Sequence, residues 1–442
     1  MYAPNLLSSI FGFLNDNSDY AVLRNYETLP ESNPSRDIDI IISKKCFSGI
    51  KHELVSIINK EGWKIITYLN SDRLVTWVCG RVNDDGSVEL IQFDFFFNTS
   101  VYGILLIPAS YFIANRVYNG KIYHVNRVCE FLDKYFYDRA VGAPYPEKYK
   151  AIREEVENNT AVNEMLKNVF GVNGVAQCDK LSGKRLLLNA FLHTPFISFS
   201  GFLKFEYYRI SNYLRSNTGF SIGFTGPDGI RKTTVINKII DSLGVVFRDA
   251  HEYMHFRPTL FGNLSDVAHS AGLKREVDKN YDNPHRGGRT GKLSSLLRLF
   301  YYTIDYILGY WIKIKSITRI TRLVIFDRYY TDIICDSRRS RIFLNPKFLY
   351  YFGRIFIPSL DYNILLTADT DVIMSRKQEL SASDLELIKK NIYFLASKPG
   401  YFLVHNNASP DDAVVEILKY VFENQNNKNL KRLGLRKFLE KR

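Results

Sequence analysis

The sequence contains few cysteines and no arrangement that would pair them. The five cysteines are scattered along 442 residues, and no two form a Cys-x-x-Cys pair. An odd and scattered set excludes a disulfide framework or a zinc knuckle as the basis of the fold. It favours a reducing compartment, so we expect a cytoplasmic protein.

Long uninterrupted apolar runs are also missing. The two most apolar windows, residues 93–114 and 296–314, each contain charged residues, among them Asp94 and Asp305. Neither suits a bilayer span of about 20 apolar residues. Residues 296–314 could instead form a helix that lies on a membrane surface, although a core helix is the simpler interpretation. The first residues have no basic segment followed by an apolar core, so we expect no signal peptide.

Acidic residues are outnumbered by basic ones. The chain has 46 Asp and Glu against 59 Lys and Arg, which gives a net charge of +13. Such an excess suits an anionic partner, which could be a nucleotide, a phosphorylated glycan, nucleic acid or an acidic membrane surface. Apolar residues make up 46% of the chain, which excludes a disordered protein.

The length exceeds what one ordinary core accommodates, so several domains are expected. Residues 1–120 alternate short helices and strands and predict an α+β domain. Residues 121–218 look mostly helical and predict a connector. Residues 219–424 alternate strands and helices, which predicts an α/β domain with a parallel sheet covered by helices on both faces. Residues 425–442 predict a polar and basic tail.

The most informative segment is residues 226–234, Gly-Pro-Asp-Gly-Ile-Arg-Lys-Thr-Thr. It follows a strand-like apolar run at 220–224 and precedes an amphipathic run at 235–243. In this strand–loop–helix order, loop amides and a helix N-terminus face an anion, and a lysine reaches the outer phosphates of a nucleotide. The predicted nucleotide-binding residues are Gly226, Gly229, Arg231, Lys232, Thr233 and Thr234, and the hydroxyl of Thr233 is placed to hold Mg²⁺.

One position departs from the phosphate-loop pattern. The pattern G-x-x-x-x-G-K-[ST] requires glycine where this chain has Arg231. A long side chain there could crowd the phosphate, or it could turn outward and donate to it. The plainer interpretation is a tight strand-to-helix turn that needs Gly226 and Gly229 for their backbone freedom.

A second apolar run, residues 323–326, ends in Asp327-Arg328. Ligands of open parallel sheets gather at the carboxyl ends of strands, so both side chains should point into the same crevice. The carboxylate could hold Mg²⁺, and the guanidinium could grip phosphoryl oxygens. A simple ion pair at a strand end is the alternative.

A third apolar run, residues 361–369, is followed by a helix-like segment that ends in Arg376-Lys377. Cations there could close over a nucleotide and stabilise charge in the transition state. Alternatively, they only complement the negative end of a helix.

In their order along the chain, these segments and the final strand–helix unit resemble the thymidylate kinases. Residues 255–258, 327–332 and 376–380 are similar to diverged thymidylate-kinase-like proteins of bacterial surface-polysaccharide gene clusters. In that group, a kinase-like domain often follows a nucleotidyltransferase-like one. The resemblance covers about half of the chain.

The resemblance implies specific roles. Lys232 would neutralise the β- and γ-phosphates of ATP, and Thr233 with Asp327 would bind Mg²⁺. The insert at residues 285–289 and the basic cluster Arg338, Arg339 and Arg341 suggest an anionic acceptor other than dTMP. The implied catalytic residues are Lys232, Asp327, Arg328 and Arg376, and the implied substrate-binding residues are Asp228, Arg257, Arg328 and Arg338.

Three aspartates in the N-terminal region form a second candidate site. Asp37 and Asp39 are two apart in an apolar strand, so both project from one face. Asp94 comes from another apolar strand, where burying it unpaired would be costly. Three converging carboxylates can hold Mg²⁺ for attack on a nucleotide's α-phosphate. The alternative is that Asp37 and Asp39 only cap a strand near solvent.

This pattern resembles the nucleotidyltransferase superfold, although Arg24-Asn25 stands where that group has Gly-Ser. The leading hypothesis for the whole chain is an ATP- and Mg²⁺-dependent phosphotransferase that acts on a nucleotide or sugar in surface-polysaccharide biosynthesis. One alternative is a nucleotidyltransferase whose kinase-like half only binds. Another is a non-catalytic scaffold for an anionic glycan or a membrane.

The expected partners are a nucleotide and a small-molecule or glycan acceptor, and not nucleic acid. Peripheral contact with the inner membrane and a homodimer are left open.

Overall fold

The computed structural model describes residues 4–33, 35, 37–215, 218–247, 251–258, 260, 291–319, 322–376 and 380–435. The chain divides into two compact units. The first unit comprises residues 1–83, 88–216 and 422–442, and the second comprises residues 84–87 and 217–421.

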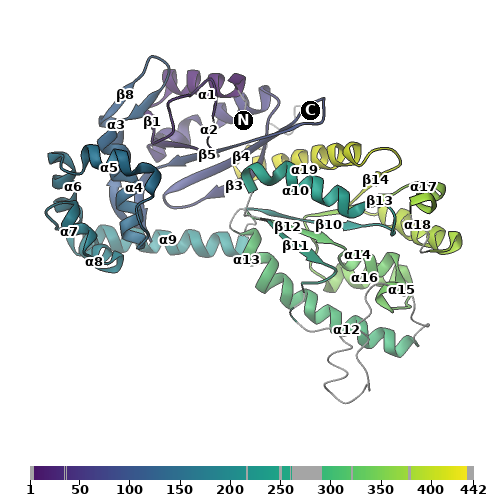
Figure 1. Cartoon of the computed structure of the whole chain (residues 1–442). Coiled ribbons are helices and arrows are strands. Elements are labelled where there is room, and N and C mark those ends of the chain that lie inside the picture. The colour runs from purple at the N-terminus through teal and green to yellow at the C-terminus, as the bar shows by residue number, and fades with distance from the viewer. Residues whose placement is uncertain are drawn as a thin grey trace. The chain divides into compact units, whose positions relative to one another are not determined.

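The first unit contains a seven-stranded mixed sheet in the order β3-β4-β5-β2-β1-β9-β8 (Figure 1). β2 is parallel to β5, with Asp39 directly opposite Asp94. Because side chains alternate between the faces of a strand, Asp37, Asp39 and Asp94 share one face of the sheet. The strands are β1 (Tyr20–Val22), β2 (Asp37–Ile42), β3 (Lys64–Asn70), β4 (Leu74–Val82), β5 (Val88–Phe96), β8 (Arg116–Tyr118) and β9 (Tyr123–Val125).

Helices cover both faces of this sheet. On one face, α1 and α2 pack with Ile40 and Trp77 in one hydrophobic core. On the other face, Ile41 and Phe96 pack against α3, α4, α6 and α8. The helices of this unit are α1 (Pro4–Asn17), α2 (Lys44–Lys60), α3 (Ala109–Ala114), α4 (Arg127–Val141), α5 (Lys150–Val156), α6 (Thr160–Phe170), α7 (Val175–Asp179), α8 (Gly183–His193) and α9 (Pro195–Arg215), with a hairpin of β6 (Asn98–Val101) and β7 (Ile104–Pro108) between β5 and α3.

The segment expected as a connector, residues 121–218, therefore contributes core helices to the first unit. Among the described residues, no single helix is long and apolar enough to cross a membrane. The pair α8 and α9, bent by 118° where they join, passes that test of length and composition only when the two are taken together.

The expected polar tail begins inside a helix. α19 (Pro410–Arg432) continues through residue 425, and its last turns belong to the first unit. The amides of Asn426 and Asn429 bond the backbone N–H and C=O of Ile65 on edge strand β3, at 3.0 and 2.9 Å. Side-chain amides can thus satisfy a sheet edge that would otherwise be left open. The final residues from 436 lie outside the described residues.

The second unit contains a five-stranded sheet in the order β11-β12-β10-β13-β14, in which every neighbouring pair is parallel. The strands are β10 (Phe220–Thr225), β11 (His251–His255), β12 (Leu323–Asp327), β13 (Tyr362–Thr367) and β14 (Tyr401–His405). β10, the first in sequence, lies at the centre, with β11 and β12 on one side of it and β13 and β14 on the other. Such a strand order opens a crevice at the carboxyl ends of the strands, where ligands bind.

Helices cover both faces of the parallel sheet, as the alternating sequence pattern predicts (Figure 1). α10 (Lys232–Phe247) and the first part of α19 lie on one face, where Phe220 contacts Phe247 and Phe402 stacks on Tyr420. The other face carries a core shared by α12 (Lys292–Gly309), α14 (Tyr330–Cys335), α16 (Pro346–Phe356) and α18 (Ala382–Ala396).

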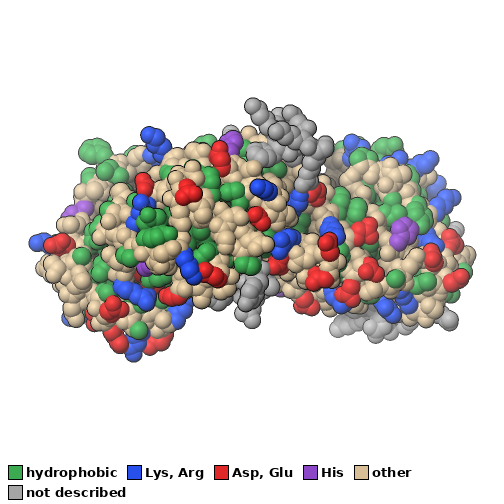
Figure 2. All heavy atoms as spheres, turned by 90° about the horizontal axis from the view of Figure 1, so that it is seen from above, with side chains coloured by type: hydrophobic (Ala, Val, Ile, Leu, Met, Phe, Trp, Pro, Cys, Tyr) green, Lys and Arg blue, Asp and Glu red, His purple; other side chains and the backbone are tan. Residues whose placement is uncertain are grey.

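The net charge of +13 is not gathered in one patch on the face shown in Figure 2. Where this face is described, basic and acidic side chains are interspersed. The charge of individual sites therefore matters more than the overall balance.

Candidate phosphate-binding site

The glycine-bearing loop joins the central strand β10 to α10 at the carboxyl edge of the sheet. A Cβ on Gly226 would lie 2.7 Å from the carbonyl oxygen of Leu366, which only glycine avoids. Gly229 has φ +83°, a conformation that glycine adopts without strain. The Asn406 amide donates to the carbonyl of Ile230 at 2.7 Å and holds the loop from β14. These contacts fix the loop before any ligand binds.

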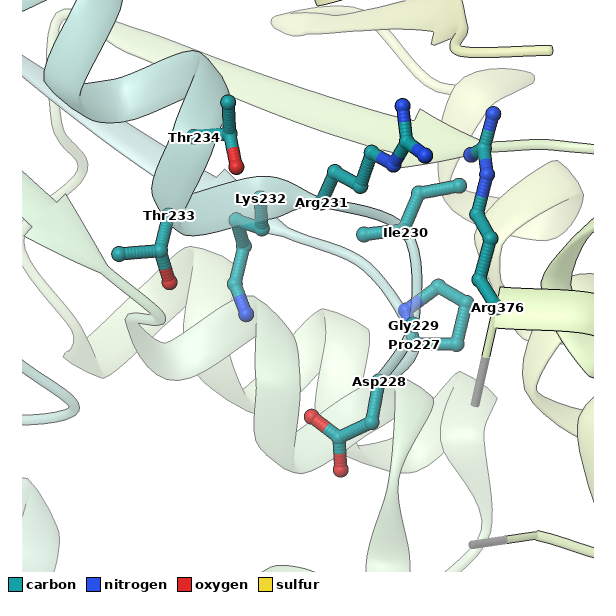
Figure 3. Close-up of a pocket in the computed structure, with 9 residues that line it drawn as sticks. All are labelled: Pro227, Asp228, Gly229, Ile230, Arg231, Lys232, Thr233, Thr234 and Arg376. Carbon is teal, nitrogen blue, oxygen red and sulfur yellow. The ribbon is translucent and has the colours of Figure 1, made fainter. Parts of the chain in front are cut away.

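The loop borders a cavity of about 350 Å³ (Figure 3), and its lining is Pro227, Asp228, Gly229, Ile230, Arg231, Lys232, Thr233, Thr234 and Arg376. Ligand pockets typically measure about 300–1,000 Å³. The structure thus brings together the predicted loop residues and Arg376, which is distant in sequence.

Lys232 is the first residue of α10, and its side chain is only 7% exposed. Its Nζ lies 3.0 Å from the carboxylate of Asp327, at the end of β12. Burial lowers the pKa of Lys232, and the nearby charge of Arg328 lowers it further. Burial alone would raise the pKa of Asp327, but Lys232, Arg328 and His255 together outweigh it, so that pKa lies below its usual value. The pair keeps a buried ammonium next to the loop.

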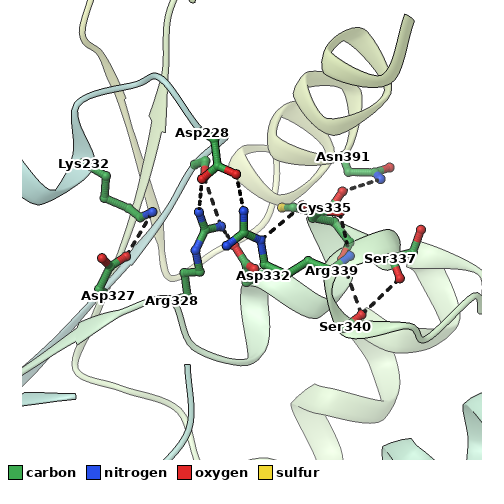
Figure 4. Close-up of polar contacts among 12 residues, drawn as sticks. Asp228, Lys232, Asp327, Arg328, Asp332, Cys335, Ser337, Arg339, Ser340 and Asn391 are labelled. Carbon is green, nitrogen blue, oxygen red and sulfur yellow. Dashed lines mark hydrogen bonds and ion pairs between the residues drawn. The ribbon is translucent and has the colours of Figure 1, made fainter. Parts of the chain in front are cut away.

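Arg328 lies between two aspartates at the same edge of the sheet (Figure 4). Its guanidinium donates to Asp228 at 2.6 Å and to Asp332 at 2.7 Å, and Arg339 also pairs with Asp228. Burial alone would lower the pKa of Arg328, but Asp332 and Asp228 outweigh it and raise that pKa. Alternating charges therefore lock Arg328 beside the loop, and Asp228 already holds two cations.

Arg231 does not lie across the loop. In Figure 3 its guanidinium points away from the ammonium of Lys232 and lies beside that of Arg376. Arg376 donates to the backbone carbonyls of Asn406 and Asn407, both at 2.9 Å. Of the two alternatives left open for Arg231, the structure has the side chain turned outward from the loop.

Two residues expected to bind substrate have other partners. Arg257 is 5% exposed and forms an ion pair at 2.8 Å with Asp305, which is fully buried. Arg338 pairs with Asp384 at 2.7 Å on the surface. Neither lines the loop cavity. The basic insert at residues 285–289 and Lys377 lie outside the described residues.

Four residues at the site had no individual role assigned from sequence. Asp332 and Arg339 complete the charge network, Tyr253 donates to Asp327 at 3.0 Å, and Asn406 holds the loop. Two of them carried a signal: Asp332 lies four residues after Arg328 and can meet it on one helical turn, and Arg339 belongs to a basic cluster in the sequence. The others depend on which strands are neighbours.

The aspartate cluster lies in the first unit. One carboxylate oxygen from each of Asp37, Asp39 and Asp94 lies within 4.8 Å of the others. Arg24 pairs with Asp39 at 2.7 Å and with Asp133 at 3.1 Å. Burial raises the pKa of Asp39 to about 7, with Arg24 opposing and the neighbouring carboxylates adding to the rise.

The donor set of this cluster fits a divalent cation, because three carboxylate oxygens converge on one point and hard cations prefer oxygen ligands. These carboxylates are less available to a cation than the sequence suggested, because two of them already have partners. Asp94 already accepts hydrogen bonds from Thr76 and Gln92, and Arg24 holds one oxygen of Asp39. Asp37 is the more open member, being partly exposed.

Comparisons with known proteins give no family for this chain. No known protein-family profile and no curated protein matches the sequence. Among solved structures, thymidylate kinase from Ehrlichia chaffeensis shows 15% identity and a TM-score of 0.33, covering 46% of this chain and 98% of that one. Thymidylate kinase from Candida albicans shows 17% identity and a TM-score of 0.33, covering 47% of this chain and 93% of that one.

Deoxyadenosine kinase from M. mycoides, solved with bound dATP, shows 15% identity and a TM-score of 0.28, covering 46% of this chain and 98% of that one. The structural neighbours are thus thymidylate and deoxynucleoside kinases, over about half of the chain. Likenesses this slight do not define the function of this chain.

Proposed function

We propose that the second unit is an ATP- and Mg²⁺-dependent phosphotransferase of thymidylate-kinase-like fold, which acts on a nucleotide or sugar acceptor. One observation carries the proposal. A buried lysine, Lys232, opens the helix that follows a glycine-bearing loop, and this loop lies at the carboxyl edge of the central strand of a parallel sheet. Loop amides, helix N-terminus and lysine together favour a polyphosphate.

The side chains present fit ATP with Mg²⁺. Gly226 lets the loop pack closely against Leu366, and Gly229, with its left-handed backbone, borders the cavity. Thr233, which is exposed beside Lys232, and Asp327 offer the hydroxyl and carboxylate oxygens that Mg²⁺ prefers. Bound Mg²⁺ would supply charge neutralisation at the outer phosphates.

Phosphoryl transfer is catalysed largely by positioning and by neutralising charge. Lys232 would exchange its contact with Asp327 for an outer phosphate oxygen. Arg328 would stabilise charge on the transferred group, held in place by Asp332. Asp228 would face the acceptor, and to do so it would release one of its two cations, Arg328 or Arg339. A cytoplasmic role in surface-polysaccharide biosynthesis is part of the proposal and is supported by sequence resemblance alone.

The test is ATP turnover by the full chain, measured with a panel of nucleotide and sugar acceptors. We expect Lys232→Ala to lower turnover about 10³-fold, because a phosphate-contacting cation is lost from a site that works by charge. Lys238→Ala is the matched control, because Lys238 lies on the same helix but pairs with Asp411 at the surface. Equal turnover by wild type and Lys232→Ala would refute the proposed activity.

A second candidate function belongs to the first unit, where the aspartate cluster supports nucleotidyl transfer. We expect the full chain to bind Mn²⁺ without nucleotide and Asp37→Asn to weaken that binding about ten-fold, since one charged ligand is lost. Asp19→Asn, at an exposed ion pair with Arg116, is the control. Transfer from an α-labelled nucleoside triphosphate that survives in Asp37→Asn and Asp39→Asn would eliminate this candidate.

A further inference from the structure

Two guanidinium groups lie side by side at the rim of the loop cavity. Arg231 and Arg376 both line it, and Figure 3 shows their ends next to each other. Among the described residues, the guanidinium of Arg231 has no ion pair or hydrogen bond, and Arg376 bonds only to backbone carbonyls. Burial lowers the pKa of Arg376, and the charge of Arg231 lowers it further. Two like charges are thus placed together without a carboxylate between them.

The backbone at Arg231 is unfavourable as well. Its φ is +60°, in the left-handed region that residues with a Cβ avoid. A glycine at this position, as the phosphate-loop pattern requires, would relieve that strain. Strained residues persist where the surrounding structure holds them, and they cluster at ligand sites. Arg328, the other arginine of the site with a left-handed backbone, has φ +74°.

The cationic side chains at the loop fall into two groups that point in different directions. In Figure 3, Lys232 and Arg231 are neighbours in sequence but point to opposite sides of the loop. One ligand phosphate therefore cannot serve both groups, whereas a chain of phosphates along the cavity can. Paired guanidinium groups suit such a ligand, because each presents a planar fork of donors to phosphate oxygens.

We propose that Arg231 and Arg376 form a second anion subsite, which binds a phosphate of a nucleoside di- or triphosphate other than the one that Lys232 contacts. The subsite rests on the proposed nucleotide site. It takes the place of the close backbone contact that a glycine at position 231 would provide. An arginine there would thus be a ligand of the phosphate chain and not an obstruction.

Restoring the glycine distinguishes the two roles, because they predict opposite signs. If Arg231 is a ligand, we expect Arg231→Gly to weaken the binding of both ATP and ADP about ten-fold, as expected for loss of charge-assisted hydrogen bonds. Arg231→Gln, which keeps a side chain of similar length, should show the same loss, and so should Arg376→Gln. Calorimetric titration of the full chain measures these affinities.

The matched control is Arg341→Gly. Arg341 also has a left-handed backbone, with φ +53°, but it does not line the cavity. This variant also removes a positive charge from a left-handed backbone position, but outside the cavity, so its nucleotide affinity should stay that of wild type.

Inorganic tripolyphosphate is the second probe, since it has phosphates but no nucleoside. We expect Arg231→Gly to weaken tripolyphosphate as it weakens ATP. The subsite is overturned if Arg231→Gly binds ATP as tightly as wild type or more tightly while Lys232→Ala does not bind. It is also overturned if adenosine binding falls and tripolyphosphate binding does not. Equal ATP turnover by wild type and Lys232→Ala would instead remove the proposed activity and leave these affinities to judge the subsite.

Discussion

The two candidate sites carry opposite charge. The glycine-bearing loop lies at the carboxyl edge of the parallel sheet, and the aspartate cluster lies on one face of the mixed sheet. In the second unit, Lys232, Arg231 and Arg376 line the loop cavity with a surplus of positive charge. In the first unit, Asp37, Asp39 and Asp94 lie close together, and Arg24 pairs with Asp39. The first arrangement is suited to a bound anion and the second to a bound cation.

The two sites also differ in the direction in which the pKa of a buried carboxylate is shifted. Lys232 holds the pKa of Asp327 below its usual value, so this carboxylate is charged in the fold. Burial raises the pKa of Asp39 to about 7, so its charge is disfavoured despite Arg24. The Lys232–Asp327 pair is therefore compensated within the fold, whereas burial and neighbouring carboxylates disfavour the charge of Asp39. This contrast makes the following predictions separable.

The largest effect on stability is expected from Arg328→Gln. The change would leave Asp228 without one partner and Asp332 as a buried carboxylate without its cation. Removing one partner from a buried charge network costs about 3–5 kcal/mol. Urea unfolding of the full chain followed by circular dichroism measures this loss. A change below about 1 kcal/mol would show that the network is not formed in solution.

Smaller effects on stability are expected from replacing Asp327 and Asp39, and the two effects should differ in size. Asp327→Asn removes the counter-charge of buried Lys232 and should destabilise by about 2 kcal/mol. Asp39→Asn should change stability by less than about 1 kcal/mol at neutral pH, because a pKa of about 7 gives the charged form little advantage over the protonated one there, and Arg24 keeps Asp133. Both are measured by urea unfolding with a chelator present. A larger loss of stability in Asp39→Asn than in Asp327→Asn would contradict the difference described between the two sites.

The smallest effect is expected from Arg338→Ala. Its side chain is 49% exposed and pairs with Asp384 at the surface, and such pairs contribute about 0–1 kcal/mol. We expect little change in unfolding free energy and in the KM for ATP. A KM that rises only for the acceptor would restore the substrate-binding role predicted from sequence, whereas no change in either KM would remove it.

Sequence predicted the parts of the fold that depend on local patterns. Alternating strands and helices indicated the parallel sheet of the second unit, and Asp37 and Asp39 could be placed on one face because side chains alternate along a strand. The strand–loop–helix order of the sequence also placed the glycine-bearing loop correctly between β10 and α10. Each of these inferences uses a local pattern of residue types along the chain.

What sequence could not predict depends on neighbours that are remote along the chain. Arg257 was expected to face a ligand, but Asp305 from α12 pairs with it in the core. The amides of Asn426 and Asn429 looked like a polar tail, although they bond the edge of β3 more than 350 residues earlier, at sequence separations of 361 and 364. The outward direction of Arg231 likewise follows from the folded loop and not from its neighbours in sequence.

The most direct test is a crystal structure of the full chain with Mg²⁺ and a non-hydrolysable ATP analogue. We predict that its phosphates lie against residues 226–233, with the ammonium of Lys232 moved from Asp327 to an outer phosphate oxygen. An analogue bound elsewhere, or a loop that stays closed around the Lys232–Asp327 pair at saturating ligand, would contradict the account.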